Sequence, residues 1–549
     1  FAFLFLVFSP ASHLLSRDTV QASSGSVGAT APVVMIVFDE FPVASLIDGE
    51  GNLEEDQYPN FARLAREGTW YRNAVSVRQQ TEEAIPVMLT GREPTSDEAI
   101  PVAADYPFNL FTLLADVYQV RASEAVTELC PAYACAEAAQ VKEPPAVRWR
   151  SLADDLAVVA GHLLLPSDIS EDLPPIEQTW GNFATADTRA TFDIIARFND
   201  RVEADRRRQV DDFLAILRAP TDQPTLYFAH LLFPHIPWTY LPSGQSYPAS
   251  SPAPGSTPTG WEDDEWLVAQ AYQRHLLQVQ YADTIIGEVL GALDEAGRFD
   301  ETLLVVLADH GTADVPNVDH RRVVTPETVG HIAAIPLFIK HPFQELGGVD
   351  DYRAETLDLL PTIADLLDVR IPWSTEGVSL AAPQRPEREA TTVVGSQGPI
   401  TFGVTGFEKL AASREQKEWF DDRGPWGLAP VGQDDLLGAE LSELTIEPGG
   451  SVTAALTHPD WYREVDPAAD PFPALMTGRL GGSPDGDLVL AVAINGRVAA
   501  VTRTYQDDEG STRFQVMVPP TGFRDGRNQV ELLVVEGTGA DRILRTLGP

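Results

Sequence analysis

The sequence predicts an α/β protein in which helices sandwich a mostly parallel sheet, followed by a small C-terminal domain that resembles a β-sandwich. Apolar, β-branched runs alternate with helical patterns between residues 31 and 385, and this alternation is typical of parallel sheets covered on both faces. After residue 444 the pattern changes to short alternating runs, two of which flank the hairpin dipeptide Asn495-Gly496.

The chain has 549 residues, enough for several folding units of about 100–200 residues each. Hydrophobic residues make up 44% of it, which is sufficient for packed cores. The patterns divide the chain into four segments: the end of a membrane segment plus a linker (1–30), an α/β domain (31–385), a connecting region (386–444) and a β-rich C-terminal domain (445–549).

The charge balance argues against two classes of partner. The chain has 39 Lys and Arg against 81 Asp and Glu, a net charge of −42. Such an excess of carboxylates repels phosphate backbones and anionic membrane surfaces, and the longest basic run is only Arg206-Arg207-Arg208. We therefore expect no nucleic-acid partner.

The first eight residues are all apolar, and the chain begins without Met. Eight residues cannot span a bilayer core, which needs about 20, so we interpret them as the end of a longer hydrophobic segment. We expect a membrane anchor; the remnant of a signal peptide is the alternative. Either interpretation places the body of the protein outside the cytoplasm.

The two cysteines are Cys130 and Cys135. Zinc binding would need further Cys or His ligands nearby, and none is close in sequence. A local disulfide is the favoured interpretation, in agreement with an oxidising compartment, and two buried free thiols are the alternative.

The expected elements follow from hydrophobic periodicity. The strands are expected at 31–38, 70–77, 225–232, 302–307 and 335–339, and the helices at 58–67, 151–165, 191–217, 265–296 and 355–367. A further helix is expected to begin at Thr81, which has the features of an N-cap residue, and to stop at Gly91.

Acids follow two of the buried strands. Asp39-Glu40 ends the first strand and Asp309-His310 ends the fourth, and in open α/β sheets ligands bind at these carboxyl ends. Asp and His leaving a strand together can face one cation, and a carboxylate from a neighbouring strand would complete a site with oxygen and nitrogen ligands. Each pair alone is also compatible with ordinary helix-cap or loop residues.

In order and spacing, several segments resemble the sulfatase and alkaline-phosphatase superfamily between about residues 31 and 380. The matching segments are Val33–Glu40, Tyr58–Gly68, Pro86–Arg92, Tyr281–Asp283, Leu307–Gly311, Ile335–Ile339, Thr356–Thr362 and Gly377–Leu380. The resemblance implies an alkaline-phosphatase-like fold with a metal-dependent active site.

The resemblance places Thr81 where sulfatases have the cysteine that is converted to formylglycine. Threonine cannot be converted, and Glu83 and Ile85 stand where sulfatases have Pro and Arg. In having Thr at this position the chain resembles the superfamily's phosphodiesterases and its membrane phosphoglycerol and phosphoethanolamine transferases. Thr81 is then the expected nucleophile.

The resemblance also implies a ligand set for one divalent ion, Mn, Zn, Mg or Ca. The expected ligands are Asp39, Glu40, Thr81, Asp309 and His310. Glu40 could instead be an acid that supports the ligands without binding the ion, since the family often has two acids at this point. His235 resembles a substrate-binding histidine of the family, although a loop histidine packed on Trp238 is the plainer interpretation.

The other histidines of this region have less certain roles. His331 is a second candidate for substrate binding. His331 and His320 together could instead complete a second metal site, as in the two-metal members. His230 is expected to be buried on its strand.

Three functional hypotheses follow. The leading one is a metal-dependent phosphodiesterase or phospho-group transferase, anchored in the cell membrane, that acts outside the cytoplasm on a phospho- or sulfo-ester of an envelope lipid or glycan. The second is a sulfuric ester hydrolase that works without formylglycine. The third is a degenerate, non-catalytic protein whose C-terminal domain binds envelope polysaccharide.

Overall fold

The computed structural model describes residues 30–94, 99–135, 206–249, 253–257, 259–403, 417, 419–420, 423–449, 452–482, 487–507 and 509–547. The expected membrane segment and linker, apart from residue 30, and the expected helix at 151–165 lie outside these residues. Of the helix expected at 191–217, residues 206–218 are described and are helical. Among the described residues, no helix is both long enough and apolar enough to cross a membrane.

The α/β domain is built on a seven-stranded sheet with the order β3-β4-β1-β5-β6-β2-β7. The strands are β1 Val33–Asp39, β2 Thr69–Tyr71, β3 Gln119–Ser123, β4 Thr225–Pro234, β5 Leu303–Ala308, β6 Leu337–Lys340 and β7 Gly348–Asp350. Strands β3, β4, β1 and β5 are parallel, and β6 runs antiparallel to β5 and β2. The mostly parallel sheet is confirmed, although the strand expected at 70–77 ends at Tyr71.

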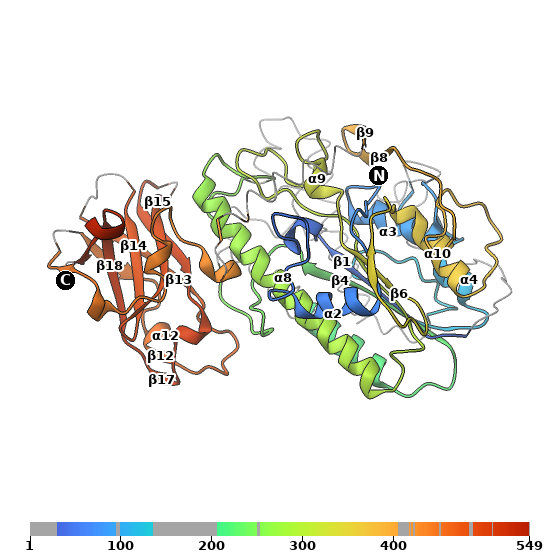
Figure 1. Ribbon diagram of the computed structural model, residues 1–549, viewed down its shortest axis with the longest axis horizontal. Helices are drawn as coiled ribbons and strands as arrows, with labels where there is room; N and C mark the ends of the chain where they lie inside the picture. The colour runs from blue at the N-terminus through green and yellow to red at the C-terminus, as the bar shows by residue number, and fades with distance from the viewer. Residues whose placement is uncertain are drawn as a thin grey trace, which may run out of the picture.

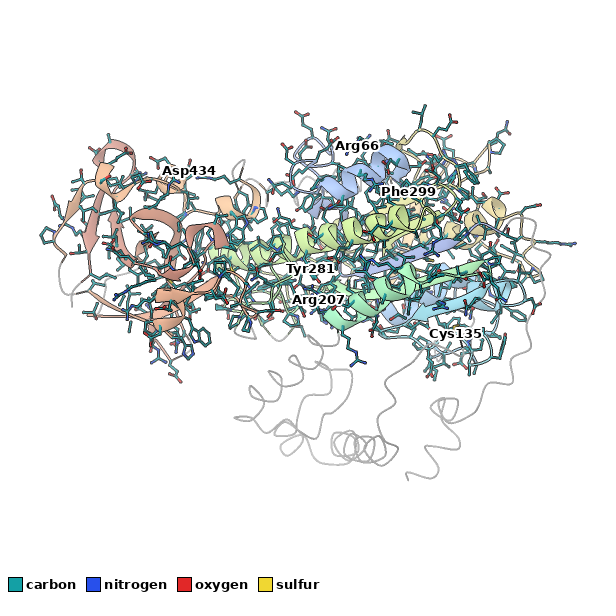
Figure 2. The ribbon with its side chains drawn as sticks, turned by 90° about the horizontal axis from the view of Figure 1, so that it is seen from below. Arg66, Cys135, Arg207, Tyr281, Phe299 and Asp434 are labelled. Atoms are coloured by element: carbon teal, nitrogen blue, oxygen red, sulfur yellow. A yellow bond between two sulfur atoms is a disulfide. The ribbon has the colours of Figure 1, made fainter. Side chains whose placement is uncertain are left out.

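Helices cover both faces of this sheet, as the hydrophobic strands require (Figure 1). They are α2 Pro59–Glu67, α3 Thr81–Thr90, α4 Leu110–Leu114, α8 Glu265–Glu295, α9 Val329–Ile332 and α10 Leu359–Leu366, the last preceded by a 3-10 turn at Thr356–Asp358. Helices α2 and α8 pack together on one side, and α3 packs against α10 on the other. Figure 2 shows Tyr281 of α8 close to Arg207, whose guanidinium carbon lies 5.7 Å from the ring centre.

Helix α3 begins at Thr81, as the sequence predicts, but its N-cap residue differs from the one expected. Gln80 is the N-cap residue and Thr81 is the first helical residue, so the expectation that Thr81 caps the helix is wrong. The reason is that the Thr81 hydroxyl faces His310 instead of the backbone of its own helix. The predicted stop is confirmed, because Gly91 has a left-handed φ of 67°, which glycine adopts without steric cost.

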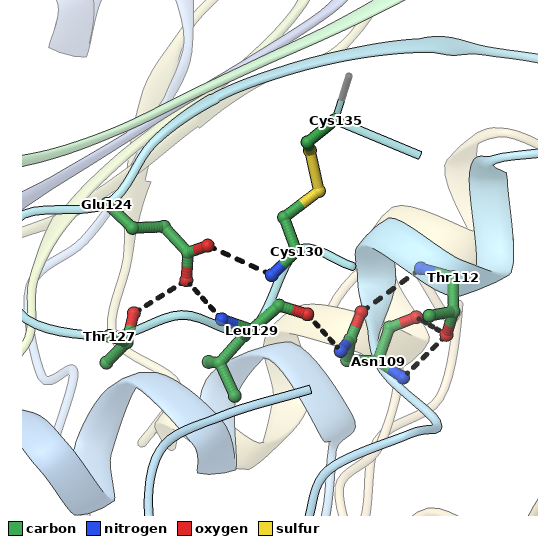
Figure 3. Close-up of a disulfide and its surroundings, with 7 residues drawn as sticks. All are labelled: Asn109, Thr112, Glu124, Thr127, Leu129, Cys130 and Cys135. Atoms are coloured by element: carbon green, nitrogen blue, oxygen red, sulfur yellow. Dashed lines mark hydrogen bonds between the residues drawn. A yellow bond between two sulfur atoms is a disulfide. The ribbon is translucent and has the colours of Figure 1, made fainter. Parts of the chain in front are cut away.

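Cys130 and Cys135 form a disulfide, as predicted, with Cα atoms 6.0 Å apart (Figure 3). The loop is also fixed by Glu124, whose carboxylate accepts hydrogen bonds from Thr127 Oγ1 and from the backbone N–H groups of Leu129 and Cys130, at 2.7, 2.8 and 2.9 Å. The disulfide and the partly buried Glu124 carboxylate together close this short loop.

The C-terminal region is one eight-stranded sheet with the order β10-β19-β18-β14-β15-β16-β13-β11. Its strands are β10 Ile446–Glu447, β11 Thr453–Leu456, β13 Leu475–Gly481, β14 Val489–Ile494, β15 Arg497–Gln506, β16 Thr512–Met517, β18 Val530–Glu536 and β19 Ile543–Thr546. Strand β15 pairs with β14 along its first part and with β16 along its last three residues. Apolar side chains of β13, β14, β16 and β18 form one core between the two halves, in agreement with the sandwich-like domain expected.

Smaller elements complete the described chain. A hairpin, β8 Ala390–Gly395 and β9 Gly398–Gly403, lies within the expected connecting region, and Val394 pairs with Arg78 beside α3. In the C-terminal region, α12 Asp460–Arg463 precedes β12 Glu464–Val465, which pairs with β17 Gly526–Arg527. The remaining 3-10 turns are Val43–Ser45, Gly424–Gly427, Asp434–Leu436, Leu441–Glu443, Pro520–Gly522 and Gly539–Asp541.

Helix α8 joins the two regions (Figure 1). Its residue Gln270 is buried and donates hydrogen bonds from Nε2 to Thr502 Oγ1 at 2.9 Å and to the Gln515 carbonyl at 2.7 Å. Gln515 Nε2 donates back to Gln270 Oε1 at 3.2 Å. Both the Nε2 and the Oε1 of this buried amide form hydrogen bonds with the C-terminal sheet. These bonds hold the sheet against the first turns of α8.

We expect Gln270→Ala to lower the free energy of unfolding by about 1–3 kcal/mol, because the buried Nε2 of Gln515 would lose its acceptor while Thr502 Oγ1 and the Gln515 carbonyl still bond to each other. Differential scanning calorimetry measures the change. The exposed Gln529 provides the control, and Gln529→Ala should shift the value by less than about 0.5 kcal/mol. Equal effects of the two substitutions would contradict a structural role for this contact.

Candidate functional site

Three adjacent strands bring the chemically active side chains to one edge of the sheet. Strand β1 lies between β4 and β5 and is parallel to both. Asp39 is the last residue of β1, and Asp309 directly follows β5. Because parallel strands end at the same edge, the two acids lie side by side, as the sequence predicts.

Asp39, Asp309 and His310 form a buried group in which one ligand atom from each lies within 4.8 Å of the others. His310 Nε2 is 3.9 Å from Asp39 Oδ1 and 3.8 Å from Asp309 Oδ2. The three side chains are at most 3% exposed. Oxygen and imidazole nitrogen atoms in this arrangement suit a divalent cation.

Thr81 joins this group from the start of α3. Its Oγ1 lies 3.3 Å from His310 Nε2, and both side chains are buried. His310 Nδ1 lies 2.9 Å from the Gly311 carbonyl, which can only accept a hydrogen bond. This contact assigns the proton to Nδ1, so that the lone pair of Nε2 faces Thr81 and the two acids.

His230 of β4 is fully buried, as predicted, and it also faces the acids. Its Nε2 lies 3.6 Å from Asp39 Oδ2 and 3.7 Å from Asp309 Oδ2. The sequence pattern did not reveal this proximity, because the position of β4 next to β1 depends on strand order. His230 is therefore a site residue that the sequence prediction missed.

Asp39 and Asp309 have no positively charged group among the described residues that balances both of their carboxylates. Burial raises the pKa of Asp309 to about 8, although hydrogen bonds from Thr81 and His310 lower it. Burial and the neighbouring Asp309 raise the pKa of Asp39 well above its ordinary value. Asp39 Oδ1, Asp309 Oδ2 and both ring nitrogens of His230 have no hydrogen-bond partner among the described residues. These unpaired, buried ligand atoms fit a bound cation.

Glu40 differs from the other predicted ligands. Its carboxylate does not join the group of Asp39, Asp309 and His310. Instead Oε2 accepts a hydrogen bond from Arg321 Nη1 at 2.6 Å, whereas Oε1 has no hydrogen-bond partner among the described residues and lies 3.7 Å from Arg322 Nε. Burial alone would raise the pKa of Glu40, but the two arginines and His235 hold it well below its usual range.

His235 lies at the border of the same site, where its Nε2 is 3.4 Å from Glu40 Oε1. Its carbonyl accepts hydrogen bonds from Arg206 Nη2 and Gln278 Nε2, both at 2.9 Å, which fix the loop after β4. Burial lowers the pKa of His235 to about 3, although Glu40 acts in the opposite direction. The imidazole is then neutral near pH 7 and 21% exposed, so it can face a ligand.

His331, the other predicted substrate-binding residue, is not brought into the acid and histidine group. It lies on α9, where burial lowers its pKa to about 4. His320, the alternative partner for a second metal, accepts a hydrogen bond from the Arg322 N–H at 3.4 Å and is also outside the group. The described residues thus gather ligands for one ion.

The acids at the start of α3 are partly neutralised. Glu83 lies 3.3 Å from Arg78 Nη1, and Arg78 also pairs closely with Glu93. Gln79, next to this arginine, accepts a hydrogen bond from the Val324 N–H at 2.9 Å and donates to Ser396 Oγ at 3.1 Å. The charge of Glu83 is therefore partly balanced by Arg78, which removes part of the conflict between acids and an anionic ligand.

Comparison with known proteins finds similarity over part of the chain. The Sulfatase family model matches residues 171–369, a span that includes Asp309 and His310. The chain is 30% identical over 150 residues to an arylsulfatase of Clostridium perfringens, covering 27% of this chain and 30% of the relative. It is 29% identical over 128 residues to a multifunctional alkaline phosphatase superfamily protein of Trinickia caryophylli, covering 23% and 24%.

Residues 171–369 thus match the Sulfatase family, and the resemblance to the sulfatase and alkaline-phosphatase superfamily is confirmed. The matched regions span about a quarter to a third of the curated relatives. Among solved structures, a phosphonate monoester hydrolase from Silicibacter pomeroyi aligns over 87% of this chain and 89% of its own, with 19% identity and a TM-score of 0.39.

We expect the metal-free protein to lose stability as the pH rises. Below about pH 4 Asp309 binds a proton in both the folded and the unfolded state. Between about pH 4 and 8 the unfolded state releases this proton and the folded state keeps it, because burial raises its pKa to about 8. The free energy of unfolding therefore falls through this window. The melting temperature of chelator-treated protein measures it.

Added Mn²⁺ should reverse this loss, raising the melting temperature by at least about 5 °C near pH 8 and by less near pH 5, where protons compete for the ligands. Asp309→Asn is the matched control. It should abolish the effect of Mn²⁺ and weaken the pH dependence. A response to Mn²⁺ that persists unchanged in this variant would rule out the site.

Proposed function

We propose that this protein is a metal-dependent hydrolase or transferase that cleaves a phosphodiester or phospho-group ester through a covalent intermediate on Thr81. The observation that supports it most directly is the Thr81 hydroxyl, held 3.3 Å from His310 Nε2 beside two buried carboxylates. The match to the Sulfatase family supports the general class of ester hydrolysis.

The residues that would hold the ion are Asp39, Asp309, His310 and Thr81, and His230 lies close enough to support their carboxylates. A bound divalent cation would lower the pKa of the Thr81 hydroxyl and offset the charge of the acids. Glu40 is not needed as a ligand, because its carboxylate is engaged by Arg321.

In the reaction, Thr81 gives up its hydroxyl proton to water and its Oγ1 forms a bond to phosphorus. The bond between phosphorus and the leaving oxygen breaks at the same centre, and the leaving oxygen takes a proton from solvent. Water, or an acceptor hydroxyl in a transfer reaction, then attacks the phosphothreonine and restores the Thr81 hydroxyl.

Groups of the chain surround the position that the phosphoryl oxygens would occupy. Thr81 is the first residue of α3, so the free N–H groups of that helix lie beside its oxygen and favour negative charge. Arg322 is 29% exposed and offers a cation at the same site. His235 Nδ1 lies 2.5 Å from the Ile236 carbonyl, which can only accept, so Nε2 of this neutral imidazole can accept a hydrogen bond from water or from an acceptor hydroxyl.

The substrate class that we propose is an anionic ester of an envelope lipid or glycan, met outside the cytoplasm. The Cys130–Cys135 disulfide supports this location, because such bonds persist in oxidising compartments. The complete group of Asp39, Asp309, His310 and Thr81 also supports an active enzyme over a degenerate binding protein.

A sulfuric ester is the second candidate substrate. Relatives named for sulfate removal favour it, among them a Δ4,5-hexuronate-2-O-sulfatase of Bacteroides thetaiotaomicron that is 27% identical over 162 residues. Thr81 disfavours it, because a threonine cannot become the formylglycine of sulfatases.

We expect Thr81→Ala to lower kcat/KM for a chromogenic phosphodiester by at least about 1000-fold, because the nucleophile is lost, whereas Thr81→Ser should keep activity within about tenfold. Parallel assays with phosphomonoester and sulfate ester substrates identify the substrate class. Preferred cleavage of the sulfate ester would favour the second candidate.

Thr90, at the other end of α3, provides a control for Thr81. Its buried hydroxyl bonds to the Pro86 carbonyl and does not face the acids. Thr90→Val removes this hydroxyl with little change in volume, and activity should stay within about threefold. Wild-type turnover in Thr81→Ala would exclude a covalent role for Thr81.

A further inference from the structure

Glu40, the residue directly after strand β1, has an unusual backbone conformation. Its φ is +55°, in the left-handed region that residues with a Cβ adopt at a steric cost. Asp39 ends the regular strand directly before it. The left-handed residue changes the chain direction at this point, and the Asp39 and Glu40 carboxylates contact different partners as a result.

Glu40 has two consecutive arginines as its charged partners, and the neutral His235 ring lies 3.4 Å from its Oε1. Arg321 is 12% exposed, donates to Glu40 at 2.6 Å and to Thr312 Oγ1 at 3.0 Å. Arg322 is 29% exposed and lies 3.7 Å from the other carboxylate oxygen. Glu40 itself is 1% exposed, so its interaction with the arginines is little screened by solvent.

We propose that Glu40 is a specificity-determining residue that sets the charge of the ester group the site accepts, and that it does not bind the metal ion. This inference rests on the proposed function of the site. The ester group in question is singly charged, as in a phosphodiester or a sulfate ester, and a doubly charged phosphomonoester is disfavoured.

The sum of the formal charges supports this selectivity. The charge of a divalent ion is balanced by the Asp39 and Asp309 carboxylates. The net charge of the site is then set by Arg321, Arg322 and Glu40. The two arginines add two positive charges and Glu40 removes one. Asp314 also acts on Arg321, and its carboxylate accepts a hydrogen bond from Trp261 Nε1 at 3.1 Å, so the net positive charge does not exceed one.

Removing the Glu40 charge should therefore favour doubly charged ligands. Glu40→Gln keeps the size of the side chain and an oxygen that can accept from Arg321, but it adds one unit of positive charge to a buried site. Because buried charges interact strongly, the substitution should raise the affinity for a doubly charged ligand, relative to a singly charged one, by at least about tenfold.

The first experiment is calorimetric titration of metal-free protein with Mn²⁺. Glu40→Gln should still bind one ion, with an affinity that falls by no more than about tenfold because a neighbouring negative charge is lost, whereas Asp39→Asn, which lacks a ligand, should lose at least about 100-fold. Equal losses in the two variants would show that Glu40 is a ligand and would overturn the proposal.

The second experiment measures binding of inorganic phosphate, near pH 8.5 where it is doubly charged, to the Mn²⁺-loaded protein. Glu40→Gln should bind it at least about tenfold more tightly than the wild type. The same variant should raise the ratio of kcat/KM for a phosphomonoester over a phosphodiester by about tenfold. This ratio does not depend on the fraction of active protein. Either an unchanged phosphate affinity or an unchanged kcat/KM ratio would overturn the proposal.

Glu83→Gln is the matched control, because Glu83 is another acid near Thr81 but is 41% exposed and paired with Arg78. It should change phosphate affinity and the ratio by less than about threefold. If Glu40→Gln does not fold, Glu40→Gly removes the same charge and suits the left-handed backbone, and the same shifts are expected. Wild-type protein that cleaves neither ester would refute the proposed function, while the Mn²⁺ and phosphate titrations would still decide the role of Glu40.

Discussion

The repulsion between two buried carboxylates is the constraint on which this structure depends. Asp39 and Asp309 lie at the ends of adjacent parallel strands, away from water, where each raises the free energy of ionising the other. Either protons or a cation must compensate for this cost. The surrounding groups follow from it: His310 and His230 present ring nitrogens to the acids, and the third acid, Glu40, is directed to arginines.

Helix α8 connects this site to the C-terminal sheet. Gln270 bonds to the sheet, and Gln278, about two turns further along the same helix, donates to the carbonyls of Pro234 and His235. The same amide accepts from the Thr239 N–H at 3.1 Å. A single helix thus fixes both the C-terminal sheet and the loop that carries His235, which gives the β-rich region a structural part in positioning the site.

The sequence predicted those parts of the site that follow from local pattern. Asp39 and Asp309 could be found because an apolar strand ends abruptly in an acid, and Thr81 because a helix signal follows it. His230, Arg321 and Arg322 could not be assigned, since their proximity to the acids depends on strand order and on loop paths. Glu40 was grouped with the ligands because its left-handed backbone, which separates it from Asp39, has no signature in a single sequence. The arrangement of the sheet was predicted as mostly parallel, but the reversed β6 was not, because its direction depends on the path of the preceding connection.

The central place of β1 also governs when the site can form during folding. Val33 of β1 pairs with Leu226 of β4 and Leu303 of β5, which follow it by roughly 190 and 270 residues. Contacts of such high sequence separation form slowly, because a long loop must close before the pairing stabilises it. During synthesis the apolar segment of β1 leaves the ribosome before its pairing partners β4 and β5. Until these strands are made it is unpaired and prone to aggregate. Metal ligation needs the ends of both β1 and β5, so it can occur only after these two strands have been made and have paired.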